Sequence, residues 1–222
     1  MKQYANYGYN DFIICTGYKG EVIKDYFMNF YIYQSDITVD LQTNDVKIHR
    51  KQTENWKVSI VDTGLKSSVM ERLIMVREFI GDEPVLVAYG DCLSDINIQK
   101  LVECHQKNQA LATVAIAHPT GRNEILALDE QGTYIGTKQG KKQKHSWVNA
   151  CSMVLEARAF DYLEENQKNQ FALSFMDCLA VHEPVQTYRH EGFWSPVETI
   201  RDKTWMEILW AENRAPWKVW ND

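Results

Sequence analysis

Short apolar runs alternate with amphipathic segments along this sequence, and this alternation restricts the possible fold more than any other feature. Residues 11–17 (DFIICTG) form a continuous apolar run closed by glycine, which is typical of a strand buried on both faces of a sheet. In residues 19–33, apolar side chains recur every three or four positions, as they do in an amphipathic helix. A strand followed by a helix is the first half of a βαβ unit, so the chain starts in the manner of an α/β protein.

The same alternation continues toward the C-terminus, with one interruption. Residues 37–49 change to a period of two around Asn44-Asp45, which predicts a β-hairpin. We therefore predict a single α/β domain over residues 1–222, with a Rossmann-like, mostly parallel sheet flanked by helices and a β-hairpin insertion. The other expected strands are 58–61, 85–89, 111–117, 148–155 and 185–188, and the other expected helices are 69–80, 96–108, 157–165, 171–180 and 199–213.

Charge and hydropathy exclude several classes of partner. The 222 residues carry 24 Lys and Arg against 30 Asp and Glu, a net charge of −6, with a pI near 5.6. An acidic chain of this kind lacks the basic footprint of a nucleic-acid-binding protein. No apolar run approaches ~18 residues, and residues 1–12 lack the apolar core of a signal peptide. We therefore expect a cytoplasmic protein with no nucleic-acid or membrane partner.

The pattern of the five cysteines also indicates a cytoplasmic location. They are odd in number and have no C-x-x-C spacing, which argues against a disulfide framework or a zinc site and for a reducing environment. We interpret them as small buried residues, and Cys92, which directly follows Asp91, as the one to test for reactivity.

Three other groups of residues receive structural interpretations. The six histidines lack metal-ligand spacing and are interpreted as surface or packing residues. The lysine-rich stretch 138–144 is typical of a solvated loop. Trp205 and Trp210 are interpreted as core or oligomer contacts, because an acidic surface offers no electrostatic support for base stacking.

The turn Tyr89-Gly90-Asp91 stands at the carboxyl end of an expected buried strand. Ligands collect at the carboxyl ends of the strands in an open parallel sheet. A carboxylate at such a position can hold Mg²⁺ through its oxygens, and magnesium at such sites commonly accompanies phosphates. We interpret Asp95, four residues further on, as the N-cap of the helix over 96–108.

A second group of chemistry-bearing residues lies in 190–203 (HEGFWSPVETIRDK). Gly192 and Pro196 punctuate a turn of aromatic residues, and Thr199 with Asp202 can form a capping box for the last helix. Glu198 directly precedes that helix, so its carboxylate could face Asp91 across the sheet edge. From these residues alone, a packed corner of the fold is the simpler interpretation.

These segments carry a resemblance to a known family. The stretches DFIICTGYKGEVIKDYF, WKVSIVDTG, YGDCLSDINI and HEGFWSPVETIRDK, with the ending APWKVW, resemble the glucose-1-phosphate cytidylyltransferases, a branch of the sugar-1-phosphate nucleotidyltransferases. The resemblance implies Mg²⁺-dependent transfer of CMP from CTP to glucose 1-phosphate, which yields CDP-glucose and pyrophosphate. It also implies a role in making lipopolysaccharide O-antigen precursors, and a homo-oligomer is expected.

The resemblance assigns roles residue by residue. Asp91, Arg72 and Lys138 would be catalytic, and the metal ligands would be Asp91 and Glu198. The nucleotide and the sugar would be bound by Ser67, Arg72, Gly90 and Asn149.

The sequence also departs from the family pattern on the ligand side. Its pattern begins after the strand and the G-G-x-G-T-R loop with which the family opens, so that first strand is expected to be missing. The family's N-G-G is replaced by Asn149-Ala150-Cys151, which adds side chains where the sugar should fit. We therefore expect weak or no activity in this form. The alternatives are an inactive homologue that acts as a binding or partner subunit, and a start codon assigned too late.

Overall fold

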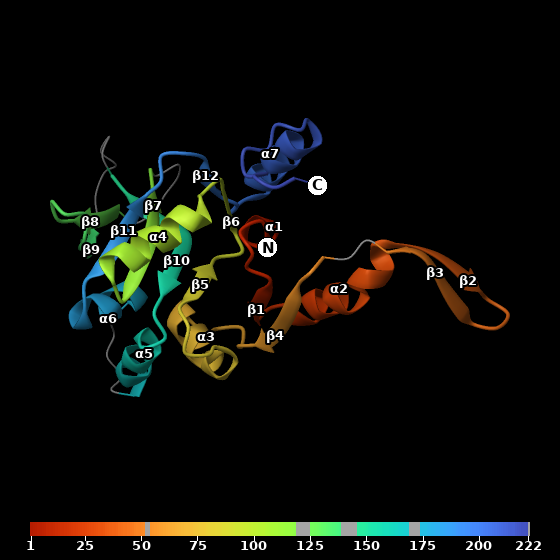
Figure 1. Cartoon of the computed structure of the whole chain (residues 1–222), viewed down its shortest axis with the longest axis horizontal. Helices are drawn as coiled ribbons and strands as arrows, with labels where there is room; N and C mark the ends of the chain where they lie inside the picture. Colours follow the sequence, from red (N-terminus) through yellow and green to blue (C-terminus); the bar gives the residue numbers. More distant parts are fainter. Residues whose placement is uncertain (52–53, 119–124, 139–145, 169–173, 222) are drawn as a thin grey trace. The chain divides into compact units, whose positions relative to one another are not determined.

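The computed structural model describes residues 1–51, 54–118, 125–138, 146–168 and 174–221. Contacts within the chain divide it into two compact units. The N-terminal unit comprises Met1 and Gly8–Phe79, and the C-terminal unit comprises Lys2–Tyr7 and Ile80–Asp222. The two units are described in turn, and their elements are labelled in Figure 1. The single domain predicted over residues 1–222 stays a prediction.

The N-terminal unit is built on two parallel strands and the helix that follows the first of them. Strands β1 (Asp11–Thr16) and β4 (Lys57–Asp62) pair in parallel over their whole lengths. Helix α2 (Gly20–Tyr33) begins four residues after β1, as the alternation in the sequence predicts. The predicted hairpin is confirmed as β2 (Ser35–Asp40) and β3 (Asp45–Lys51), with Asn44 in the left-handed region at φ 60°.

The helix predicted over 69–80 is shorter in the structure. Helix α3 covers Val69–Met75 and is followed by a short 3₁₀ turn over Arg77–Phe79. Its start is set by a capping box, in which Ser68 and Glu71 each accept a backbone N–H from the other. It ends at Val76, whose N–H is shared between the carbonyls three and four residues earlier, the tighter geometry of a helix end.

The C-terminal unit contains a four-stranded sheet in the order β11-β7-β10-β5. Strands β5, β7 and β11 point in one direction, and β10 runs antiparallel to both of its neighbours. Helix α4 packs against β7, β10 and β11, and β7 is buried along its whole length (Figure 1). The α/β class and the main strands are therefore confirmed. The bounds are Val85–Ala88 for β5, Ala112–Ala117 for β7, Val148–Leu155 for β10, Val185–Arg189 for β11, Ile98–Asn108 for α4, Ala159–Lys168 for α5 and Phe175–His182 for α6.

Several short elements of this unit lack a sequence pattern and were not predicted. They are α1 (Lys2–Ala5), the antiparallel pair β6 (Cys92–Ser94) and β12 (Trp194–Pro196), and the hairpin of β8 (Ile125–Leu128) and β9 (Tyr134–Lys138). Most of the lysine-rich stretch, residues 139–145, lies outside the described residues. None of the described helices is long and apolar enough to cross a membrane.

Helix α7 (Ile200–Ala211) is the last helix of the described residues, and its start was predicted correctly. Thr199 and Asp202 form the expected capping box. Beyond the helix, Trp217 is buried with Met206 and Leu209. Trp205 and Trp210 are 48% exposed, so they do not belong to the core, and their role as an oligomer contact stays a prediction.

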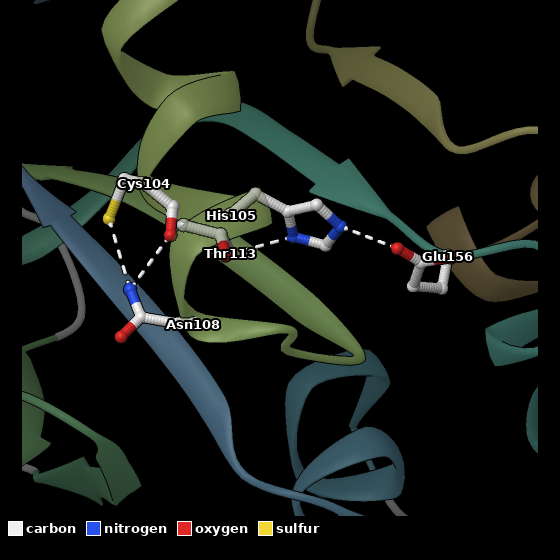
Figure 2. Close-up of polar contacts among 5 residues, drawn as sticks. All are labelled: Cys104, His105, Asn108, Thr113 and Glu156. Atoms are coloured by element: carbon white, nitrogen blue, oxygen red, sulfur yellow. Dashed lines mark hydrogen bonds and ion pairs between the residues drawn. The ribbon is translucent and has the colours of Figure 1, made fainter.

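His105 of α4 forms a buried polar network between the helix and the sheet (Figure 2). Its Nδ1 lies 3.0 Å from the Thr113 hydroxyl, and its Nε2 lies 3.0 Å from a Glu156 carboxylate oxygen. Each buried polar group is thereby satisfied, since an unpaired one would cost free energy. The interpretation of His105 as a packing residue agrees with this arrangement.

We expect His105→Ala to lower the free energy of unfolding by roughly 2–4 kcal/mol, because it leaves a cavity and an unpaired Thr113 hydroxyl. Urea unfolding followed by circular dichroism measures the change. His49→Ala, in the exposed β2–β3 hairpin, is the control and should stay within about 0.5 kcal/mol of the parent. Equal losses in the two variants would contradict the role given to the network.

The cap of α7 gives a pH-dependent prediction. Hydrogen bonds from the Thr199 hydroxyl and backbone N–H lower the pKa of Asp202 below its ordinary value of 3.8. This stabilisation is present above pH 3.8 and is lost as the pH falls through the lowered pKa. Thr199→Ala should lower Tm by about 2–4 °C at pH 7, and by less near pH 3. For Thr204→Ala, in the same helix, the difference in Tm from the parent should be the same at pH 7 and near pH 3. If the Tm loss of Thr199→Ala is also the same at the two pH values, the ionised Asp202 carboxylate does not contribute to the cap.

Candidate functional site

The exposed carboxylate of Asp91 follows the end of β5, where the sequence places the candidate site. The backbone here is fixed on one side by β10, because the Tyr89 N–H donates to the Cys151 carbonyl at 3.0 Å. Burial, followed by the nearby groups of Cys151, Asp91 and Cys92, raises the pKa of Tyr89 to about 12. The neighbouring Gly90 is open, since a Cβ there would meet no heavy atom within 4 Å.

The pairing of β6 with β12 brings the second acidic residue toward the first. Cys92 lies opposite Pro196, and the Val197 N–H donates to the Asp91 carbonyl at 2.7 Å. Glu198 is the next residue along the chain and is exposed, as Asp91 is. The backbones at 91 and 197 therefore meet at one end of this strand pair, although they are more than 100 residues apart in sequence, and Glu198 directly follows this contact.

Two cysteines complete the surroundings of Asp91. The sulfurs of Cys92 and Cys151 are 2.7 Å apart, and the Cys92 thiol donates to Oδ1 of Asp91 at 3.7 Å. Within the described residues, these three side chains are the one group whose potential ligand atoms all lie within 4.8 Å of one another, and Glu198 is not part of it. The hydrogen bond to Cys151, with burial, raises the pKa of the Cys92 thiol.

Cys151 reaches this position through an irregularity in β10. The register of β10 against β7 shifts between Asn149 and Met153, and Cys151 has φ 63°. Its N–H donates to Oδ1 of Asn149 at 2.8 Å. The sequence singled out Cys92 alone. The available signal for Cys151 was that it stands where the resembled family has glycine, the residue that adopts positive φ most readily.

Ser67 and Arg72 meet in the N-terminal unit, in the turn that follows β4. The Arg72 guanidinium donates from Nη1 to the Thr63 hydroxyl at 2.6 Å and to the Thr16 carbonyl at 3.2 Å, and from Nε to the Ser67 carbonyl at 3.1 Å. The Ser67 hydroxyl donates to the Thr63 carbonyl. These bonds hold the turn at the carboxyl ends of β1 and β4, so Arg72 is fixed rather than extended into solvent.

The predicted site residues thus fall in two places. Ser67 and Arg72 belong to the N-terminal unit, and the others belong to the C-terminal unit. Lys138 ends β9, and its side chain lies outside the described residues. The remaining predicted residues, around the Asp91 turn and the β10 bulge, are Gly90, Asp91, Asn149 and Glu198.

Asp95 does not cap α4, contrary to our expectation. The N-cap is Asn97, whose side chain accepts the Lys100 N–H at 2.9 Å. Asp95 instead lies 2.9 Å from Nε2 of the buried His190, at the corner before β12. The Asp95 carboxylate is within reach of the His190 imidazole, and Asn97, two residues nearer the helix, takes the cap.

Gly192 allows that corner to close. A Cβ at this residue would lie 2.5 Å from Oδ1 of Asp95 and 2.8 Å from Cε1 of His190, so a side chain would displace both. The turn of glycine and aromatic residues is therefore a packed corner of the fold, which is the simpler of the two interpretations of residues 190–203. By setting the start of β12, the same corner also positions Glu198.

We expect Gly192→Ala to lower the free energy of unfolding by about 1–3 kcal/mol, because the added methyl group overlaps the Asp95–His190 pair. Gly81→Ala is the matched control, since a Cβ there meets no heavy atom within 4 Å. Chemical denaturation of both variants measures the difference. Equal free energies of unfolding for Gly192→Ala and Gly81→Ala would show that the corner accommodates the methyl group without loss of stability.

Comparisons with known proteins identify first the class and then the family. No protein-family model matches the chain. A solved structure of a UDP-glucose pyrophosphorylase shares its fold with a TM-score of 0.67 at 17% identity, covering 96% of this chain and 85% of that one. The fold is that of the sugar-1-phosphate nucleotidyltransferases.

Two curated relatives are closer in sequence. The glucose-1-phosphate cytidylyltransferase of Salmonella typhi is 37% identical over 222 residues, which are 99% of this chain and 85% of that protein. Its counterpart in Salmonella typhimurium is 36% identical over the same shares. The chain belongs to the glucose-1-phosphate cytidylyltransferase family, so the resemblance found in the sequence is confirmed.

Proposed function

We propose that this chain transfers a cytidylyl group from CTP to a hexose 1-phosphate, with Asp91 and Glu198 as ligands of Mg²⁺. Membership of the family supports a role in nucleotide-sugar synthesis. The observation that carries the proposal is the 2.7 Å bond from the Val197 N–H to the Asp91 carbonyl, because it holds the residue before Glu198 against the backbone of Asp91 at a strand end. The proposed setting is the cytoplasm, in a homo-oligomer that makes precursors of surface polysaccharide.

The donor set around Asp91 fits magnesium in part. Carboxylate oxygens are the ligands that Mg²⁺ prefers, and both acidic side chains are exposed. The thiols of Cys92 and Cys151 suit softer metals and are not assigned to magnesium. When bound, Mg²⁺ would neutralise charge on the phosphates of the nucleotide.

The chemistry asks the protein mainly for positioning. An oxygen of the sugar phosphate attacks the α-phosphorus of CTP in line, a new P–O bond forms, and pyrophosphate leaves with the electrons of the broken bond. We assign phosphate binding to Arg72 and Lys138. Arg72 is held by three hydrogen bonds at a strand end, so little conformational freedom would be lost on binding.

We assign the binding of the nucleotide and the sugar to one open backbone position and two polar side chains. Gly90 leaves room for a ligand to approach the main chain. Ser67 and Asn149 supply a hydroxyl and an amide. We expect turnover to be weak, because Cys151 places a side chain next to Asn149 and brings a second sulfur within reach of Asp91.

The alternative is a partner subunit that binds the ligands without turnover. The observation that favours it is the same sulfur pair, which occupies space beside the proposed metal ligand. The two functions differ in whether pyrophosphate is released.

The test incubates the purified chain with CTP, Mg²⁺ and glucose 1-phosphate and measures pyrophosphate. We expect Asp91→Asn to lower kcat/KM at least about 100-fold, since even groups that only orient a metal ligand contribute 10–100-fold. Asp82→Asn, an exposed acid on the loop before β5, is the matched control and should keep the parent rate.

Release of pyrophosphate at equal rates by the parent and by Asp91→Asn would refute the enzymatic proposal. No release, together with a rise in Tm when CTP and glucose 1-phosphate are added, would support the partner-subunit alternative.

A further inference from the structure

Cys92 and Cys151 form a sulfur pair that the proposed reaction does not use. Their Sγ atoms are 2.7 Å apart, well inside the contact distance of two unbonded sulfurs. They come from elements 59 residues apart in sequence, the start of β6 and the bulge of β10. Their closeness is therefore a product of the fold and not of local spacing.

The backbone holds both cysteines in place. The Cys151 carbonyl accepts the Tyr89 N–H, and its N–H is bound to the Asn149 side chain. Cys92 is fixed by its pairing with Pro196 in β12. Backbone hydrogen bonds and strand pairing therefore set the positions of both cysteines.

The separation of the two sulfurs distinguishes between two chemical outcomes. A disulfide bond is about 2.05 Å long, so the sulfurs have to approach by well under 1 Å. Two thiolates on one tetrahedral zinc ion, with Zn–S bonds of about 2.3 Å, stand roughly 3.7 Å apart, so the pair would have to open by about 1 Å. The separation is thus nearer to that of two bonded sulfurs than to that of two thiolates on one zinc ion.

Both side chains are half-buried, so small oxidants have access to them. The other cysteines do not share this arrangement: the Cys104 sulfur accepts from Asn108 at 3.6 Å, and the Cys178 thiol donates to the Tyr162 carbonyl at 3.6 Å. Cys15, Cys104 and Cys178 belong to no group of potential ligands among the described residues.

We propose that Cys92 and Cys151 are a site of reversible oxidation, at which the two thiols form an intramolecular disulfide beside Asp91. With hydrogen peroxide as oxidant, one sulfur first attacks an oxygen, so that an S–O bond forms, the O–O bond breaks and one water is released. The second sulfur then displaces the hydroxyl group, the S–S bond forms and a second water leaves. Two electrons pass from the sulfurs to the peroxide, and an external dithiol reverses the change.

Oxidation would also change the surroundings of Asp91. In the reduced chain the Cys92 thiol donates toward Oδ1 of that residue at 3.7 Å. A disulfide has no S–H group, so the carboxylate loses this donor while the sulfur stays nearby. Transient disulfides of this kind are the form in which cross-links occur in reducing compartments.

The test counts thiols in the full chain. The reduced protein should titrate five thiols after denaturation, and three after treatment with a few equivalents of hydrogen peroxide. Peptide mass mapping should find residues 92 and 151 in one cross-linked peptide pair, lighter by two hydrogens, and dithiothreitol should restore all five thiols. This count does not depend on nucleotide transfer, so it can fail or succeed independently of the proposed function.

Single variants identify the pair. Cys92→Ser and Cys151→Ser each start with four thiols and should keep four after the same treatment. Cys104→Ser, the matched control, should fall from four to two. Circular dichroism before treatment shows whether each variant is folded.

Two results would overturn the proposal. One is that five thiols survive in the oxidised parent, or that the cross-link joins other cysteines. The other is that the reduced chain binds one zinc ion and that this ion protects both thiols from peroxide, whereas added magnesium gives no protection. That result would make the group a soft-metal site instead.

Discussion

Strand β10 is the element on which the C-terminal unit depends. It lies between β5 and β7 and runs against both, and its residues Met153, Val154 and Leu155 are almost completely buried. Burying a side chain of this size stabilises the fold by about 1.5–3 kcal/mol. Because β10 is paired on both edges, the end of β5 and the end of β7 are placed relative to each other by one strand.

Strand pairings and chain connections link β10 to the candidate site in both directions along the sheet. Strand β7 pairs with β11, and the His190 N–H after β11 still donates to the Ile116 carbonyl at 2.8 Å. The corner at Gly192 then directs the chain into β12, which pairs with β6 next to Asp91. Strand β5 returns to β10 through Tyr89. The acidic residues are therefore positioned by backbone hydrogen bonds and strand pairings, not by side-chain contacts alone.

Patterns of local periodicity predicted most of this fold, and long-range pairings explain what they missed. The strands and the hairpin were predicted from apolar runs and alternating patterns, although β1 and β5, which were expected to be buried, are only partly buried. The cap at Thr199 follows from its spacing to Asp202. The β6–β12 pair is three residues long on each side, too short to show a period. The distance between Cys92 and Cys151 depends on a bulge, which spacing in the sequence does not reveal.

The same limit explains the mistaken cap. Asp95 and Asn97 are both good N-cap residues, and composition alone does not choose between them. The choice is made by His190, which comes from a distant part of the chain and takes the Asp95 carboxylate. In the candidate site, the types of the acidic residues were readable from the sequence, and their approach to each other came from the tertiary fold.

The backbone at Cys151 has a consequence for anyone who alters this protein. A residue with a Cβ in the left-handed region is less stable than glycine there by roughly 1 kcal/mol. A library screened for heat resistance alone would therefore enrich glycine at this position and discard the sulfur with it. Thermal stability favours glycine at this position, whereas the proposed disulfide requires cysteine, so a selection for one of these properties acts against the other.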